Sequence, residues 1–376
     1  PSFDWATLIA NKDKEIDRLN AAYKSTLARA KAELIESRAT LVDRNTIAVA
    51  GRQVSAEVIL IATGSWPELP KIPGIEHAIT SNECFHLDKL PERVVVVGGG
   101  YIALEFAGIF NGLGSDTTVL YRGEQVLRGF DMDVRNFLAD ELGKKGIKIR
   151  CKTDVARIDK QGGALRLTLK DGATLECDQV LYATGRRPLT RNMGLDKVGV
   201  QLDEIGAVKV DARSQTSVPN IYAVGDCTNR INLTPVAIRE GHAFADSVFG
   251  KTPWQVDHAD CPSAVFTQPP VGSVGLSEEA ARAKFGAIDI YRESFRPMKH
   301  TMTGRTERAL MKLIVDRKSQ VVVGAHMVGS DAPEIIQTLA IAVKLKATKQ
   351  QIDQTIAVHP TAAEEFVTMR TPVAAE

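Results

Sequence analysis

The pattern of apolar and polar positions alternates between helical and strand-like segments. Over residues 3–34, apolar side chains recur at helical spacing among lysines and glutamates, which predicts one long amphipathic helix packed on a sheet. Strand-like runs follow at ATLVD, TIAVA and EVILIATG, and Asn45 and Gly51 mark turns between them. The proline-rich run WPELPKIPG then interrupts regular structure, and we interpret it as a linker.

The second half of the chain mixes two kinds of pattern. A strand–helix–strand unit is predicted from residue 93 to about 121, followed by a helix and several strands up to a second ATG at 183–185. From Asp260 onward, VFTQPPVGSVGL and ALMKLIVD predict an antiparallel sheet, with helices at 331–346 and 349–355. A chain of 376 residues exceeds the size at which one core keeps growing, so two or three domains are expected.

Composition and charge narrow the function classes. A hydrophobic content of 44% and a charged content of 25% are typical of a soluble globular protein. The balance of 47 basic and 46 acidic side chains, without a basic block or acidic tail, argues against nucleic-acid and membrane-surface partners. No apolar run is long enough to span a membrane and no signal pattern opens the chain, which makes a cytoplasmic location the default expectation. Five scattered cysteines without a CxxC pair argue against structural zinc and a disulfide framework.

The strongest local signal is RVVVVGGGYIALEFAGIF at residues 93–110. The apolar strand leads directly into Gly98-x-Gly100-x-x-Ala103 and then into a helix. Gly98 suits a tight turn, Gly100 allows a pyrophosphate to approach the backbone, and Ala103 allows close packing of helix and strand. The free N–H groups at the helix N-terminus then face the phosphates. This context predicts a dinucleotide site.

The end of the next strand indicates which dinucleotide is bound. An NAD site would carry Asp or Glu there, but TTVLYRGEQVLR ends its apolar run in Arg122, and Arg128 follows six residues later. Two guanidinium groups suit a dianionic 2′-phosphate, so NADPH is favoured over NADH. The alternative is that both are solvated surface arginines.

Two further stretches carry candidate chemistry. In VPNIYAVGDCTN, residues 218–229, a strand ends in Gly225 and Asp226 before a helical run, although on spacing alone Asp226 reads equally well as a helix cap or turn residue. In HPTAAEEFVTMRTP, residues 359–372, Glu364 stands five residues after His359. A carboxylate at that position can fix one imidazole tautomer and raise the basicity of the other nitrogen, whereas the alternative is a structural or solvated histidine.

Four motifs in order carry a resemblance over essentially the whole chain. GGGYIALEFAGIF, ATGRRP, VGDCTNRINLTPVAI and HPTAAEEFVTMRTP look like the glutathione reductase branch of the pyridine nucleotide–disulfide oxidoreductases. The resemblance implies an α/β fold with two Rossmann-like dinucleotide-binding domains, the FAD one incomplete, and a C-terminal α+β dimerisation domain. The implied domains are a remaining N-terminal part of the FAD domain at 1–64, an NADPH-binding domain at 65–188, an FAD return segment at 189–258 and the dimerisation domain at 259–376.

The resemblance also implies roles for matching residues. Tyr101 would be the lid that NADPH displaces to reach the flavin, with Ile102 and Glu105 beside the nicotinamide end. His359 and Glu364 would be an acid–base pair donated across a homodimer interface. Arg305, in a segment FRPMKHTMTGR that resembles the strand lining the glutathione site, would contact a substrate carboxylate. The other residues implied to bind NADPH are Gly98, Gly99, Gly100, Ala103, Arg122 and Arg128. Asp226 and Thr234 are implied to bind FAD. Thr63, Gly64 and Gly185 are further implied cofactor-binding residues.

The chain departs from the family pattern at its beginning. Family members open with a strand and a GxGxxG loop for the FAD pyrophosphate, followed by a Cys-x-x-x-x-Cys redox pair, and neither motif occurs in this sequence. A truncated gene model, an incomplete clone and a naturally short protein are all open explanations. We therefore expect this polypeptide by itself to bind FAD weakly and to be inactive.

The function implied for the complete enzyme is the NADPH-dependent reduction of glutathione disulfide to glutathione through FAD and a redox dithiol. In that reaction His359, oriented by Glu364, would protonate a leaving thiolate. Dihydrolipoyl dehydrogenase shares the HPTxxE run but uses NADH, so Arg122 and Arg128 count against it. Trypanothione reductase, mercuric reductase and a non-catalytic NADPH-binding dimerising module remain as alternatives.

Overall fold

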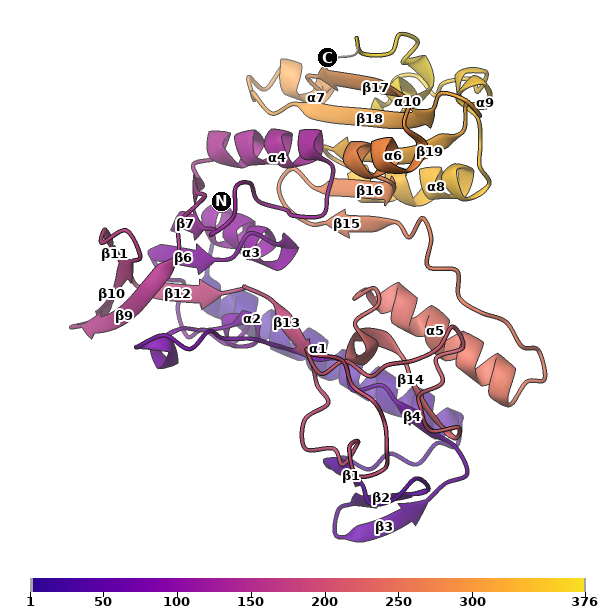
Figure 1. Ribbon diagram of the computed structural model, residues 1–376. Coiled ribbons are helices and arrows are strands. Elements are labelled where there is room, and N and C mark those ends of the chain that lie inside the picture. Colours follow the sequence, from indigo (N-terminus) through magenta and orange to yellow (C-terminus); the bar gives the residue numbers. More distant parts are fainter. Residues whose placement is uncertain (1–2, 375–376) are drawn as a thin grey trace. The chain divides into compact units, whose positions relative to one another are not determined.

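The computed structural model describes residues 3–374, and the chain divides into two compact units. One unit contains the segment ending at Glu68 together with Gly185–His258, and the other contains Leu69–Thr184 together with the segment from Ala259 onward. Figure 1 labels the elements of both. The outermost residues of the predicted domains at 1–64 and 259–376 lie outside the described range, and the predicted boundaries remain a prediction.

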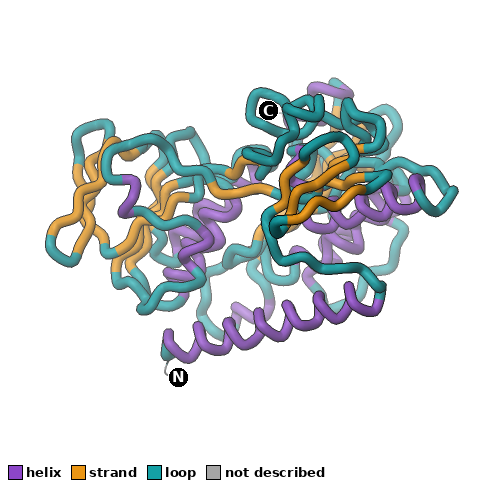
Figure 2. The backbone as a smooth tube through the Cα atoms, turned by 90° about the horizontal axis from the view of Figure 1, so that it is seen from below, coloured by secondary structure: helices purple, strands orange, loops and turns teal. Residues whose placement is uncertain are grey.

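The first unit begins with a long helix, α1 (Trp5–Arg29), which runs without a break in Figure 2. The Asp4 carboxylate accepts the Thr7 backbone N–H at 2.7 Å and caps its N-terminus. The helix ends five residues earlier than the predicted 34, and Lys31 has a positive φ of 56°. None of its residues is buried, so the expectation that it packs on a sheet is not met. Amphipathic spacing identifies an apolar face without identifying what covers that face.

The remaining elements of the first unit form small sheets and one helix. An antiparallel meander is built from β1 (Ala39–Leu41), β2 (Thr46–Val49) and β3 (Arg52–Ser55), of which β3 is wholly exposed and was not predicted because it carries no apolar pattern. Two strand pairs surround the candidate flavin residues. The parallel pair is β4 (Ile59–Ile61) with β14 (Ile221–Ala223), and the antiparallel pair is β5 (Ser65–Pro67) with β13 (Arg186–Pro188). The helices η2 (Gly225–Thr228) and α5 (Thr234–Val248) follow β14.

The second unit contains a four-stranded parallel sheet in the order β12-β6-β7-β8. Residues 94–97 are almost completely buried, as expected for a strand paired on both edges within a parallel sheet. The predicted strand–helix–strand unit is present. The elements of this region, including a smaller antiparallel sheet, are η1 (Ile75–His77), α2 (Ser81–Cys84), β6 (Arg93–Val97), α3 (Tyr101–Gly112), β7 (Asp116–Leu120), α4 (Met132–Lys144), β8 (Lys148–Arg150), β9 (Val155–Gln161), β10 (Ala164–Leu169), β11 (Thr174–Cys177) and β12 (Gln179–Tyr182).

The same unit contains a five-stranded antiparallel sheet in the order β15-β16-β19-β18-β17, with α8 packed against β16 and β19. Together with the parallel sheet it confirms the predicted mixed α/β fold. The elements are β15 (Ser263–Val265), β16 (Val271–Gly275), α6 (Glu278–Phe285), β17 (Ile288–Phe295), α7 (Met298–Thr301), β18 (Ala309–Asp316), β19 (Val322–Val328), α8 (Ala332–Lys344), α9 (Lys349–Asp353), η3 (Ala362–Glu364) and α10 (Glu365–Thr368). Within residues 3–374, no helix combines the length and apolarity needed to cross a membrane.

One predicted strand is wrong. FRPMKHTMTGR was matched to a strand, but β17 ends at Phe295, α7 follows directly after Pro297, and Arg305 lies in an exposed loop. Proline has no N–H to donate to a strand ladder, and its fixed φ is compatible with the start of a helix. Arg305 is therefore held on a loop instead of a strand.

Candidate functional site: the glycine turn, the β14–α5 turn and the His359 segment

The glycine turn between β6 and α3 leaves space beside the N-terminus of α3. Gly98 has φ +144°, and a Cβ there would lie 2.3 Å from the Ala183 carbonyl oxygen, so both conformation and space require glycine. Gly100 stands at the N-cap of α3 without a side-chain cap, and a Cβ on it would meet no atom within 4 Å. Ala103, one turn later, is completely buried against the strand. The turn therefore leaves space beside the N-terminus of α3, the end of a helix that attracts phosphate.

The loop after β7 lies against this turn. The Leu127 N–H donates to the Gly99 carbonyl at 2.6 Å, and a Cβ on Gly99 would lie 2.5 Å from the Tyr121 ring. These contacts place the neighbouring residues Arg122 and Arg128 on the loop next to the glycine turn, and both side chains are exposed. Neither forms an ion pair with any carboxylate in residues 3–374. Two guanidinium groups are thus available to an anionic ligand.

The first turns of α3 carry the other residues predicted to meet NADPH. Tyr101 and Glu105 are four residues apart and share one helix face. Tyr101 is partly exposed at 40%, and Ile102 is half-buried. The Glu105 carboxylate accepts the Phe266 backbone N–H at 2.9 Å. Burial raises the pKa of Glu105 above its ordinary value, and this hydrogen bond only partly offsets the effect.

In the first unit, Ser65 and Arg186, which directly follow the two ATG runs, meet next to Asp226. The Ser65 hydroxyl donates to Asp226 Oδ2 at 2.7 Å, and the Arg186 guanidinium donates to Ser65 Oγ at 2.8 Å and to the Ser65 carbonyl at 2.8 Å. The residues just before these strands, Gly64 and Gly185, have φ of +69° and +148° with open space where a side chain would stand. The two glycines therefore leave space near the hydrogen-bonded Asp226 carboxylate.

Two observations test whether this region fits FAD. Thr63 Oγ1 is buried and has no hydrogen-bond partner in the described part of the chain, which is the state expected of a group that a bound ligand satisfies. The helix α5 begins at Thr234 after an N-cap, Leu233, that offers no side-chain cap. Together with Asp226, these groups fit the hydroxyl-rich ribityl and phosphate part of a flavin.

A buried carboxylate that the sequence did not single out supports the Asp226 turn. Glu240 is 1% exposed, and its Oε2 accepts the Gly225 N–H at 2.7 Å. Its Oε1 lies 3.0 Å from the Arg230 guanidinium and 2.8 Å from His258 Nε2. A lone glutamate among the apolar and small residues of α5 is the only sequence signal for it. Glu240 fixes the backbone from which Asp226 projects.

The structure brings His359 and Glu364 together. His359 Nδ1 lies 3.0 Å from Glu364 Oε2, and the histidine side chain is 78% exposed. The carboxylate is more sheltered at 20%, because Glu364 also receives the Thr361 N–H in a capping box. With Nδ1 donating to the carboxylate, Nε2 is the nitrogen available to exchange a proton with a ligand.

None of the five cysteines forms a reactive pair. No disulfide joins them, and burial raises the pKa of Cys84 and of Cys177 to about 12. A thiol with a raised pKa is a poor nucleophile at neutral pH.

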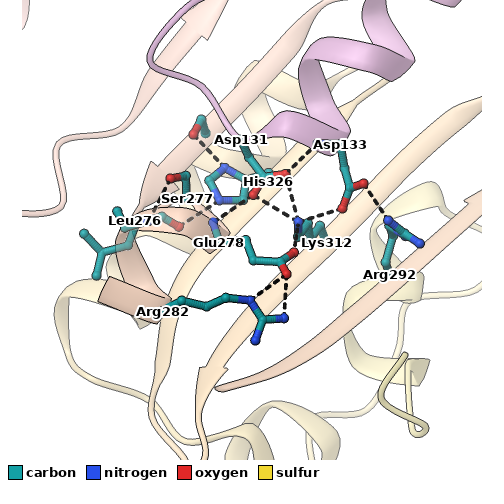
Figure 3. A network of polar contacts seen from close by, with 11 residues as sticks. Asp131, Asp133, Leu276, Ser277, Glu278, Arg282, Arg292, Lys312 and His326 are labelled. Atoms are coloured by element: carbon teal, nitrogen blue, oxygen red, sulfur yellow. Dashed lines mark hydrogen bonds and ion pairs between the residues drawn. The ribbon is translucent and has the colours of Figure 1, made fainter. Parts of the chain in front are cut away.

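A buried polar network in the second unit was also missed (Figure 3). Lys312, 1% exposed on β18, donates to Asp131 at 2.9 and 3.0 Å, to Asp133 at 2.6 Å and to Glu278 at 2.7 Å. Burial alone would lower the pKa of Lys312, but the three carboxylates hold it above its ordinary value. Likewise burial would raise the pKa of Asp131, and Lys312 holds it below. The sequence signal is a lysine inside the apolar run ALMKLIVD.

Comparisons with known proteins identify the family. Residues 3–241 match the pyridine nucleotide-disulphide oxidoreductase model, and residues 261–370 match its dimerisation domain. The chain is 52% identical to glutathione reductase of Burkholderia cepacia, over 98% of this chain and 82% of that protein. It is 48% identical to the chloroplastic/mitochondrial glutathione reductase of Pisum sativum, over 99% and 68%. It is 42% identical to trypanothione reductase of Trypanosoma congolense, over 98% and 78%.

A solved structure gives the same result. The HOCl-induced flavoprotein disulfide reductase RclA from Escherichia coli superposes with a TM-score of 0.91 at 27% identity, over 98% of this chain and 86% of that one. The comparisons confirm the resemblance and the dependence on FAD and NAD(P)H, and they give no support to the expectation that the chain is inactive. The chain belongs to the pyridine nucleotide-disulphide oxidoreductase family of flavin-dependent disulfide reductases.

Proposed function

We propose that this protein reduces glutathione disulfide to glutathione with NADPH as electron donor. The observation that carries the proposal is the identity of 52% and 48% to glutathione reductases of a bacterium and a plant over nearly the whole chain. FAD, when bound, supplies the two-electron carrier between the nicotinamide and a disulfide. The residues described above divide into groups that hold the coenzyme, hold the flavin and move a proton.

The coenzyme groups select NADPH. The N-terminus of α3 after Gly100 receives the pyrophosphate, and Arg122 and Arg128 receive the 2′-phosphate. A carboxylate at the end of β7 would repel that dianion, whereas two exposed arginines without ion-pair partners in the described chain attract it. Tyr101, Ile102 and Glu105 line the adjoining helix face.

The flavin groups come from the first unit. Asp226 accepts from the ribityl hydroxyls with the oxygen that Ser65 leaves open, and Thr63 Oγ1 finds its partner in the ligand. Thr234 opens a helix whose N-terminus attracts the negative side of the cofactor. Gly64 and Gly185 leave the space that such a ligand requires.

The proton-transfer pair is His359 and Glu364. Disulfide exchange is fastest when the leaving thiolate is protonated or stabilised, and an imidazole exchanges protons near neutral pH. Glu364 keeps Nδ1 protonated, so His359 holds and transfers a proton at Nε2. We infer a homodimer in which each subunit receives this pair from its partner, supported by the dimerisation-domain match at 261–370.

Arg305, exposed on the loop after α7, offers a guanidinium to a carboxylate of glutathione. The lack of a disulfide among the five cysteines supports a reducing compartment, with the cytoplasm as the default.

Trypanothione reductase is the second candidate, because two such enzymes are 42% and 43% identical to this chain. Glutathione disulfide is an anion with four carboxylates, whereas in trypanothione a polyamine replaces two of them and adds positive charge. An exposed arginine at 305 favours the anionic substrate.

Steady-state oxidation of NADPH by the FAD-loaded protein separates these candidates. Glutathione disulfide, trypanothione disulfide and lipoamide are compared as substrates. We expect kcat/KM to be at least about a hundredfold higher for glutathione disulfide, because a substrate whose charge does not complement the site loses a few kcal/mol of binding free energy. Preference for trypanothione disulfide would reassign the substrate. Binding of NADPH without turnover of any disulfide would favour the non-catalytic module instead.

A further inference from the structure

Arg135, in the first turns of α4, gives its guanidinium to the backbone of the loop after β7. Its Nε donates to the Val126 carbonyl at 2.8 Å, and a terminal nitrogen donates to the Gln125 carbonyl at 2.6 Å. The side chain is half-buried and forms no ion pair within residues 3–374. A rigid, planar guanidinium bonded to two consecutive carbonyls fixes the direction of that segment.

The next residue of the loop is fixed from the other side. The Leu127 N–H donates to the Gly99 carbonyl at 2.6 Å, and the Val126 and Leu127 side chains are buried. Leu127 has a φ of +56°, a conformation that a leucine adopts only when its surroundings impose it. Arg128 follows directly, so its backbone is held between the glycine turn and the Arg135 guanidinium.

The helix that carries Arg135 is itself anchored (Figure 3). Asp131, the N-cap of α4, is completely buried and accepts from Lys312 and from the backbone N–H of Glu278 at 2.9 Å. Lys312 lies on β18 of the five-stranded antiparallel sheet, so the start of α4 is bonded to that sheet. This network holds the start of the helix from which Arg135 projects.

We propose that Arg135 is a positioning residue for recognition of the coenzyme 2′-phosphate, acting through the loop backbone to place Arg128 without touching the ligand. This rests on the proposed function of Arg122 and Arg128. A preorganised arginine loses less conformational freedom on binding than one on a mobile loop, so affinity for the phosphate depends on the contact that holds the loop.

Calorimetric titration with two coenzyme fragments tests this without turnover. Adenosine 2′,5′-bisphosphate carries the 2′-phosphate, and adenosine 5′-monophosphate lacks it. Arg135→Met should weaken binding of the bisphosphate by about fivefold to thirtyfold and leave the monophosphate within about twofold, since one charged contact is worth about that ratio. Arg166→Met, which removes an exposed arginine from β10, is the matched control and should change neither affinity.

Arg135→Lys separates positioning from charge. Lysine keeps the positive charge but lacks the planar pair of N–H donors that bonds both carbonyls in one fixed geometry, so positioning predicts that the bisphosphate affinity falls nearly as far as in Arg135→Met. Full affinity in Arg135→Lys would overturn the proposal, because the residue would then act through its charge alone. An equal loss for both fragments would also overturn it, since the variant would then have damaged the whole site. Thermal midpoints of each variant identify any loss of fold, and the lysine variant preserves the half-buried packing.

Arg128→Gln distinguishes failure of the proposal from failure of the coenzyme assignment. If Arg128→Gln leaves the preference for the bisphosphate unchanged, the assignment of Arg128 to the 2′-phosphate is wrong. If Arg128→Gln removes the preference but Arg135→Met does not, only the positioning role is wrong. In the double variant Arg128→Gln/Arg135→Met, the loss should not exceed that of Arg128→Gln, because Arg135 acts through Arg128.

Discussion

At the scale of single residues, the His359–Glu364 pair has the most direct consequence for catalysis. Its Nδ1 is bonded to the carboxylate at 3.0 Å and the side chain is exposed at 78%, so Nε2 can meet a substrate. In the FAD-loaded enzyme, His359→Ala should lower kcat for glutathione disulfide by about 10²- to 10⁴-fold, the usual contribution of a general acid–base group. Steady-state kinetics at saturating NADPH measure this loss.

The matched control at this scale is His86→Ala, which removes another exposed histidine in the same unit and should leave kcat unchanged. Glu364→Gln keeps the shape of the side chain but weakens the hold on Nδ1, so its loss should be smaller than that of His359→Ala. A loss of only about twofold in His359→Ala would exclude a general acid–base role for this histidine.

At the scale of elements, the buried network joins α4, α6 and β18 through one ammonium. Lys312 is 1% exposed and Asp131 is 0% exposed, so Lys312→Met leaves a buried carboxylate without its partner. We expect this to lower the free energy of unfolding of the second unit by about 3–5 kcal/mol, as for other buried pairs broken on one side. Urea unfolding, monitored by far-UV circular dichroism, measures the change in the free energy of unfolding.

Two further variants are controls for Lys312→Met. Lys148→Met breaks an ion pair with Asp116 whose side chains are 61% and 52% exposed, and it should cost less than about 1 kcal/mol. Lys312→Met/Asp131→Asn removes the charge on both sides and should be less destabilised than Lys312→Met alone. If Lys312→Met lowers the free energy of unfolding no more than Lys148→Met does, the Lys312 ammonium does not hold these elements together.

The elements also show what a sequence can and cannot predict. The strand, turn and helix at 93–112 were predictable because an apolar run and small residues act within one short stretch. Lys312 and its partners Asp131 and Glu278 are separated by 34 to 181 residues, and no periodicity links them. The strand predicted around Arg305 was wrong because a proline at 297 outweighs motif similarity. The support of Asp226 by Glu240 likewise depends on tertiary contact.

At the scale of the whole molecule, the C-terminal region leaves large apolar side chains uncovered. Ile356 is 93% exposed and Val358 is 72% exposed, immediately before His359, and Ile341 and Leu345 on and after α8 are also exposed. Fully burying one such side chain stabilises by about 1.5–3 kcal/mol. All four lie within the segment 261–370 that matches a dimerisation domain, so a second copy of the chain is the expected cover.

Assembly and catalysis are coupled when His359 is donated across the dimer interface. Ile356→Glu places a charge where the partner is expected, and it should weaken the dimer about thirtyfold or more, as for loss of a central interface residue. Sedimentation equilibrium should show a dimer for the unmodified protein at micromolar concentration and a growing monomer fraction for the variant. Because we propose that His359 serves the partner's site, monomers should lose disulfide turnover and keep their affinity for adenosine 2′,5′-bisphosphate. Ile205→Glu, at an exposed apolar position of the first unit, is the control and should alter neither. A monomeric unmodified protein, or a monomeric variant with full turnover, would contradict donation of His359 in trans.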